Sequence, residues 1–145
     1  MSVRSRDRPH ARIYAHWRTI PAWFTLCPRG QALIVAVLMS YRPDSPNAFH
    51  LTDAVAAEIL GCSQNIARRV VGEVIERGWF HVERRGGFRG PARARGRIVS
   101  LAMFETDARP PEPSRFEKWR PAEPIPNGSN SAVLVRAAVF QRGEN

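Results

Sequence analysis

The sequence predicts a mainly α-helical domain that carries a small β-hairpin, an α+β fold. Two segments with helical periodicity, 53–60 and 64–77, are separated by only three residues, Gly61-Cys62-Ser63. Gly78 ends the second segment, and strand-like segments at 79–83 and 97–103 then flank a loop rich in Arg and Gly. The 145 residues, 43% of them hydrophobic, suffice for one packed core but not for two.

An apolar stretch at 31–41 predicts the first helix. It is longer than a typical strand and ends at a turn-forming cluster, 42–47, although Ile34, Val35 and Val37 leave a strand open. Upstream, residues 13–27 contain two Trp, one Tyr and one Phe, a density of rings that favours packing against a core. We therefore expect this aromatic segment to dock on the helices that follow it.

Capping residues delimit the next two helices. Thr52 is a good N-cap for 53–60, and Asp53 complements the helix dipole. Gly61 is a typical C-terminal stop, and Ser63 is again an N-cap residue. In the second helix an apolar stripe is expected to face the core: Ile66, Ala67, Val70, Val71, Val74 and Ile75. The opposite, exposed face is centred on Asn65, Arg69, Gly72 and Glu76, with Gln64 and Arg68 beside it.

Composition divides the chain into four parts. Residues 1–12 are polar and Arg-rich and predict a flexible basic arm, and residues 13–104 form the domain. Residues 105–126 contain six prolines, which exclude regular helix or sheet, but Phe116 and Trp119 could pin this segment onto the domain. Residues 127–145 are expected to be a flexible tail, within which the apolar run 132–140 is either disordered or a partner-binding segment, including one for a homodimer.

The net charge of +9 is concentrated in two blocks. Residues 1–18 carry five arginines against one acid, and residues 61–97 carry nine against three. Arg supplies 21 of the 22 basic residues, which fits the codon bias of a GC-rich genome, but a uniform bias would not cluster them. The clustering indicates a polyanionic partner: nucleic acid or, less often, an acidic membrane surface.

Several classes of protein are disfavoured. Cys27 and Cys62 stand alone without metal-ligand spacing, so we expect buried, reduced thiols and no metal. The four histidines show no catalytic spacing, and no Gly-rich phosphate loop precedes a helix, so we expect neither an enzyme nor a cofactor. The longest apolar run, 32–39, is far short of the roughly 20 residues of a membrane span. Because the N-terminus also lacks a secretory signal, a cytoplasmic protein without a membrane partner is expected.

The order helix, turn, helix, hairpin is that of a winged helix-turn-helix. Residues 56–69 (AAEILGCSQNIARR) and 73–80 (EVIERGWF) resemble the bacterial winged helix-turn-helix DNA-binding family, in which a Leu-Gly-x-Ser turn precedes the recognition helix. Flanking pieces at 20–23, 86–88 and 116–121 resemble helix-turn-helix proteins of plasmids, prophages and mobile elements. The resemblance covers about 14–121 and implies a winged helix with aromatic N-terminal and Pro-rich C-terminal extensions. One departure is Gly72 in mid-helix, which either permits close approach to DNA or has no role.

Two sets of side chains are the candidate DNA contacts. A recognition helix reads the major groove with its N-terminal residues, where Arg pairs with guanine and Asn or Gln with adenine. The candidates there are Ser63, Gln64, Asn65, Arg68 and Arg69, with Ser63 also capping the helix. The candidates in the wing, expected to contact phosphates or the minor groove, are Arg84, Arg85, Arg89, Arg93, Arg95 and Arg97. The alternative for each set is a solvated surface.

The function predicted from these features is sequence-specific binding of double-stranded DNA by a transcriptional regulator. Two alternatives stay open. One is an accessory or initiator protein for replication or recombination of a mobile element, and the other is a winged helix used for protein assembly or RNA binding.

Overall fold

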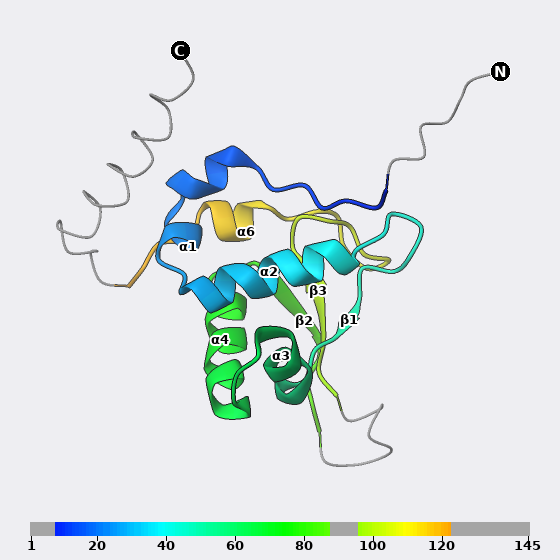
Figure 1. Cartoon of the computed structure of the whole chain (residues 1–145). Helices are drawn as coiled ribbons and strands as arrows, with labels where there is room; N and C mark the ends of the chain where they lie inside the picture. Colours follow the sequence, from blue (N-terminus) through cyan, green and yellow to red (C-terminus); the bar gives the residue numbers. More distant parts are fainter. Residues whose placement is uncertain (1–7, 88–95, 123–145) are drawn as a thin grey trace.

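A computed structural model describes residues 8–87 and 96–122, which fold into a mixed α+β structure (Figure 1). In these ranges five α-helices accompany one small antiparallel sheet of three strands. The predicted α+β class is therefore confirmed, and the arrangement is compatible with a winged helix.

Three helices make up the centre of the fold: α2 (Pro28–Ser40), α3 (Asp53–Leu60) and α4 (Gln64–Glu76). The segment with the strand alternative is a helix, and it begins at Pro28. Cys27 caps it, with Sγ accepting a hydrogen bond from the Gly30 amide at 3.4 Å, and Pro28 occupies the first helical position, where no amide hydrogen is needed. Helix α2 packs on both α3 and α4.

The sheet has the strand order β1-β3-β2, formed by β1 (Phe49–His50), β2 (Phe80–Arg84) and β3 (Ile98–Leu101). β2 and β3 form the predicted hairpin, each within three residues of its predicted ends, whereas β1 was not predicted. A Cβ at Gly96 would stand 1.8 Å from the ring of His50, so a larger residue would displace this ring where the chain enters β3 beside β1.

Four aromatic side chains, Trp17, Trp23, Trp79 and Phe116, form what we call the aromatic cluster. They come from a 3₁₀ helix, η1 (Ala15–Thr19), from α1 (Pro21–Phe24), from the residue before β2 and from α6 (Ser114–Glu117). The rings of Trp79 and Phe116 stack at 4.0 Å, and Trp17 meets Trp79 edge-on at 5.0 Å. Both extensions thus contribute to the hydrophobic core. The expectation that prolines exclude a regular helix from 105–126 was wrong at Ser114–Glu117, because this single turn follows Pro113 and contains no proline itself.

Gly78 shows why the chain after β3 fits so closely against the domain. Its φ of 85° lies in the region that favours glycine, and a Cβ there would stand 2.7 Å from the carbonyl oxygen of Arg115. Further along, Trp119 donates from Nε1 to Glu76 at 2.9 Å and lies under the guanidinium of Arg77 at 4.8 Å. Residues 110–122 therefore follow the end of α4 closely.

The two cysteines differ from expectation in one respect. Both are free thiols, but both are half-buried rather than buried. Burial, followed by the neighbouring Glu73 carboxylate, raises the pKa of the Cys27 thiol, which keeps it protonated.

Candidate nucleic-acid interface

The turn between α3 and α4 is built by local hydrogen bonding. Thr52 Oγ1 accepts from the Val55 amide at 3.1 Å, and Ser63 Oγ accepts from the Ile66 amide at 3.3 Å, so both helices have the predicted caps. Gly61 ends α3 with φ 62° and ψ 41°, a left-handed conformation, and the Cys62 amide donates to Ala57 O at 3.1 Å. These caps fix the direction in which α4 leaves α3.

Helix α4 is amphipathic, as predicted. Ala67, Val70, Val71 and Val74 are buried against the other helices. The side opposite them is exposed near its start, and we call the following residues the recognition face: Ser63, Gln64, Asn65, Arg68 and Arg69.

The members of the recognition face differ in their partners. Within the described ranges, the side chains of Gln64, Asn65 and Arg69 make no hydrogen bond or ion pair. Ser63 Oγ serves the helix cap. Arg68 donates from Nε to Asp53 Oδ2 at 3.0 Å, although its side chain is 68% exposed. Gln64, Asn65 and Arg69 are therefore the members free to bind a ligand.

Asp53 joins three elements at this end of the molecule. Its second oxygen accepts from Nη2 of Arg97 at 3.0 Å, so one carboxylate at the start of α3 holds one arginine from α4 and one from the residue before β3. Partial burial pulls the pKa of this carboxyl upward, but the hydrogen bonds and charges of Arg68 and Arg97 outweigh it and lower the pKa below its ordinary value. Asp53 therefore stays ionised and fixes the hairpin against α3 and α4.

The predicted wing residues fall into three groups. Arg97 also donates from Nε to Leu51 O at 3.0 Å, which makes it a brace at the start of β3, on the loop side of the hairpin. Arg84 donates to Gly96 O at 3.0 Å across the hairpin, and Arg85 is exposed with no hydrogen bond or ion pair from its side chain in the described part. Arg89, Arg93 and Arg95 lie outside the described residues.

Figure 1 shows how these parts are arranged. Helix α3 and the far ends of β2 and β3 lie at one side of the molecule, whereas η1, α1 and α6 lie at the other. The ion pairs of Asp53 place the start of α4 beside the same end of the hairpin. Asp53 thus joins Arg68 of the recognition face to Arg97 at the start of β3.

Sequence reasoning did not identify the bridging role of Asp53. It gave Asp53 only a helix-dipole role, because its partners lie 15 and 44 residues away. The one available signal was an acid at the first position of a helix, ahead of the Arg-rich block 61–97.

Other kinds of site find little support in the described residues. Within 8–87 and 96–122 there is no group of three or more His, Cys, Asp or Glu placed to hold a metal ion. In the same ranges no helix has both the length and the apolar character needed to cross a bilayer. The glutamates of α4 and β2 are paired: Glu73 and Glu76 with Arg77, and Glu83 with Arg109.

Comparison with known proteins gives no relative: no family model, no curated protein and no solved structure matches the chain significantly.

Proposed function

We propose that this chain is a sequence-specific double-stranded DNA-binding protein of the winged helix-turn-helix type that acts as a transcriptional regulator. The observation that carries the proposal is the start of α4, where Gln64, Asn65 and Arg69 are exposed and have no partner among the described residues, while the opposite side of the helix is buried. Amide and guanidinium groups on the first turns of a helix are the groups that read adenine and guanine edges in the major groove.

The hairpin has a separate task in this proposal. Arg85 projects beyond the part of the hairpin braced by Arg97, and the loop that follows contains three further arginines in the sequence, Arg89, Arg93 and Arg95. Positive charges beside a recognition helix contact phosphates, which raises affinity for every sequence equally. Helix α4 would therefore supply base preference and the hairpin general affinity.

The proposal is tested by selecting duplexes from a random DNA pool with the full chain and measuring affinity for the best site and for random duplex. Asn65→Ala and Arg69→Ala should each weaken binding to the best site by about 1–3 kcal/mol and relax the base preference. Arg85→Ala should weaken binding to all sequences by a similar factor. Arg18→Ala, an exposed arginine on η1, is the matched control and should change little.

Two results would reject the proposal. The first is a pool in which no sequence is enriched, and the second is an equal loss on the best site and on random duplex for the two α4 variants. A genome-wide map of bound sites would then separate a regulator, bound at promoters, from an accessory protein for replication or recombination, bound at origins or attachment sites.

A further inference from the structure

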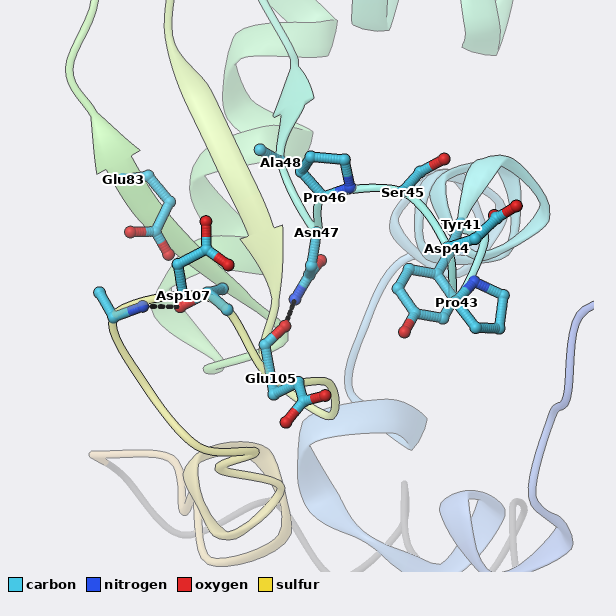
Figure 2. A pocket seen from close by; sticks show the side chains of 12 residues that line it. Tyr41, Pro43, Asp44, Ser45, Pro46, Asn47, Ala48, Glu83, Glu105 and Asp107 are labelled. Carbon is cyan, nitrogen blue, oxygen red and sulfur yellow. Dashed lines mark hydrogen bonds between the residues drawn. The ribbon is translucent and has the colours of Figure 1, made fainter.

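Two grooves of opposite charge flank the loop that follows α2. The first, the acidic groove, has a volume of about 710 Å³ and lies between residues 41–48 and residues 105–108 (Figure 2). Its charged lining residues are all acids: Asp44, Glu83, Glu105 and Asp107. The strongly basic chain therefore carries a local surface of the opposite sign.

Most of the charge in the acidic groove is not neutralised. Glu83 is paired with Arg109 and accepts from Ser100 Oγ. By contrast, the carboxylates of Asp44, Glu105 and Asp107 are exposed and make no hydrogen bond or ion pair within the described residues. Three negative charges are thus left open to a partner.

The second groove, the basic groove, has a volume of about 550 Å³ and lies between the arm 8–14 and the end of α2. Its charged and titratable lining residues are Arg8, His10, Arg12, Tyr14, Tyr41 and Arg42, with no carboxylate among them. The guanidinium of Arg42 is fixed, because Nη1 donates to Met39 O and Tyr41 O at 2.7 Å each. The side chains of Arg8 and Arg12 have no partner in the described ranges.

A rigid ridge separates the two grooves. Tyr41 and Pro43 line both of them, and the ring of Tyr41 stacks on Phe104 at 3.9 Å with 6° between the planes. Apolar side chains are exposed beside the basic groove, since Ile13, Tyr14 and Met39 are 53%, 47% and 56% exposed. Exposed apolar groups with a charged rim are typical of protein interfaces.

We propose that this surface binds a second copy of the chain, about a two-fold axis near Tyr41 and Pro43. A two-fold rotation about that ridge places the acidic groove of each copy against the basic groove of the other, so every acid–base contact is made twice. One occupant then neutralises both grooves and covers the apolar side chains between them. A small anion would fill only the basic groove, and a basic peptide only the acidic one.

The dimer surface is independent of the proposed DNA binding. It uses residues 8–14, the loop after α2, Glu83 of β2 and residues 105–108, and none of the residues of the recognition face. Dimerisation would leave both recognition faces uncovered and would give the DNA-binding protein two recognition helices.

The test is the molar mass of the full chain, measured by sedimentation equilibrium at low and high salt with protein near 100 µM, roughly the range in which weak dimers form. The wild-type chain should be a dimer that salt weakens, because the contacts are largely ionic. Two variants reverse one groove each: Asp44→Lys with Glu105→Lys and Asp107→Lys, and Arg8→Glu with Arg12→Glu. Each variant alone should raise the dimer dissociation constant at least tenfold.

The mixture of the two variants is the decisive sample. One then carries two positive grooves and the other two negative grooves, so an equimolar mixture should form a one-to-one heterodimer. Arg18→Glu with Lys118→Glu, two exposed residues outside both grooves, should leave the dimer intact, and circular dichroism checks that all variants fold. A monomeric wild-type chain, a dimer that persists in either groove variant, or a mixture that stays monomeric would each overturn the proposal.

Discussion

The two ends of the molecule treat their polar side chains in opposite ways. Around the aromatic cluster, two indole groups have partners: Trp79 Nε1 donates to Ala22 O at 3.0 Å, and the half-buried Trp119 donates from Nε1 to Glu76. At the start of α4, Gln64 and Asn65 have none within the described residues. Where the fold uses a polar side chain it supplies a partner from the chain itself, so exposed groups left without one are the candidates for ligand binding.

The largest effect is expected where the C-terminal segment enters the core. Phe116 is 1% exposed and stacked on Trp79, so Phe116→Ala should lower the free energy of unfolding by about 3–5 kcal/mol. Lys118→Ala, exposed two residues later, should change it by less than about 0.5 kcal/mol. Urea denaturation of both variants measures the difference. Similar small losses in the two would show that residues 114–118 do not contribute to the core.

Asp53→Asn sharpens the contrast, because Asp53 is the acid that pairs with Arg68 of the recognition face. Loss of its charged hydrogen bonds to Arg68 and Arg97 should cost about 1–2 kcal/mol of stability. Affinity for random duplex DNA should nevertheless rise, since a negative charge is removed and Arg68 is released. Anisotropy titration with random duplex measures the affinity. A fall in affinity would indicate that Asp53 acts chiefly by holding Arg68 and the hairpin in the binding position.

Gly72 tests whether the exposed side of α4 is tuned for folding or for a ligand. A Cβ at Gly72 would meet no atom within 4 Å, so Gly72→Ala should stabilise the helix by about 1 kcal/mol. Thermal or urea denaturation measures this gain. A simultaneous loss of DNA affinity would identify Gly72 as a point of close approach, and a loss of stability would contradict the open environment of this position.

The smallest effect concerns pH and the polar side of the sheet. His81 donates from Nε2 to Glu112 at 2.9 Å, while its Nδ1 accepts from Arg109 and Arg115, which can only donate. Burial first, and then the charge of Arg115, lowers the pKa of His81 below 6.5. The folded chain therefore binds fewer protons than the unfolded chain, so this contribution to stability is present above pH 6.5 and is lost as the pH falls below it.

Replacement of His81 provides the check on that sign. Denaturation midpoints across this pH range should depend less on pH in His81→Gln than in the wild-type chain. A steeper dependence in the variant would contradict a neutral His81 in the folded state.

Local signals explain most of what the sequence could predict. Helix α3 spans exactly the predicted 53–60, and α4 ends one residue early, because Thr52, Gly61 and Ser63 act through bonds to neighbouring residues. Strand β1 was missed because it has two residues, too few for any periodicity. It is defined instead by pairing with β3, almost 50 residues later.

In the candidate interface, the exposure of the side chains was predictable from the sequence, but their hydrogen-bond and ion-pair partners were not. Helical periodicity placed Gln64, Asn65, Arg68 and Arg69 on the exposed side, and capping identified Ser63 before them. The structure has all five exposed. Periodicity could not show that Arg68 is paired and Arg69 is not, or that Arg97 is a brace and Arg85 a free cation. These differences depend on the ion pairs of Asp53, which join elements far apart in the sequence.

The central claim concerns exposed cations that have no partner among the described residues. Those at the start of α4 and in the hairpin bind DNA, and those elsewhere do not. The direct measurement is the salt dependence of binding to random duplex DNA for two variants that each lose two charges. Arg69→Ala with Arg85→Ala should reduce the slope of log affinity against log salt by about 0.9 per lost phosphate contact, whereas Arg18→Ala with Lys118→Ala should leave it unchanged. Equal reductions in the two variants would contradict the claim.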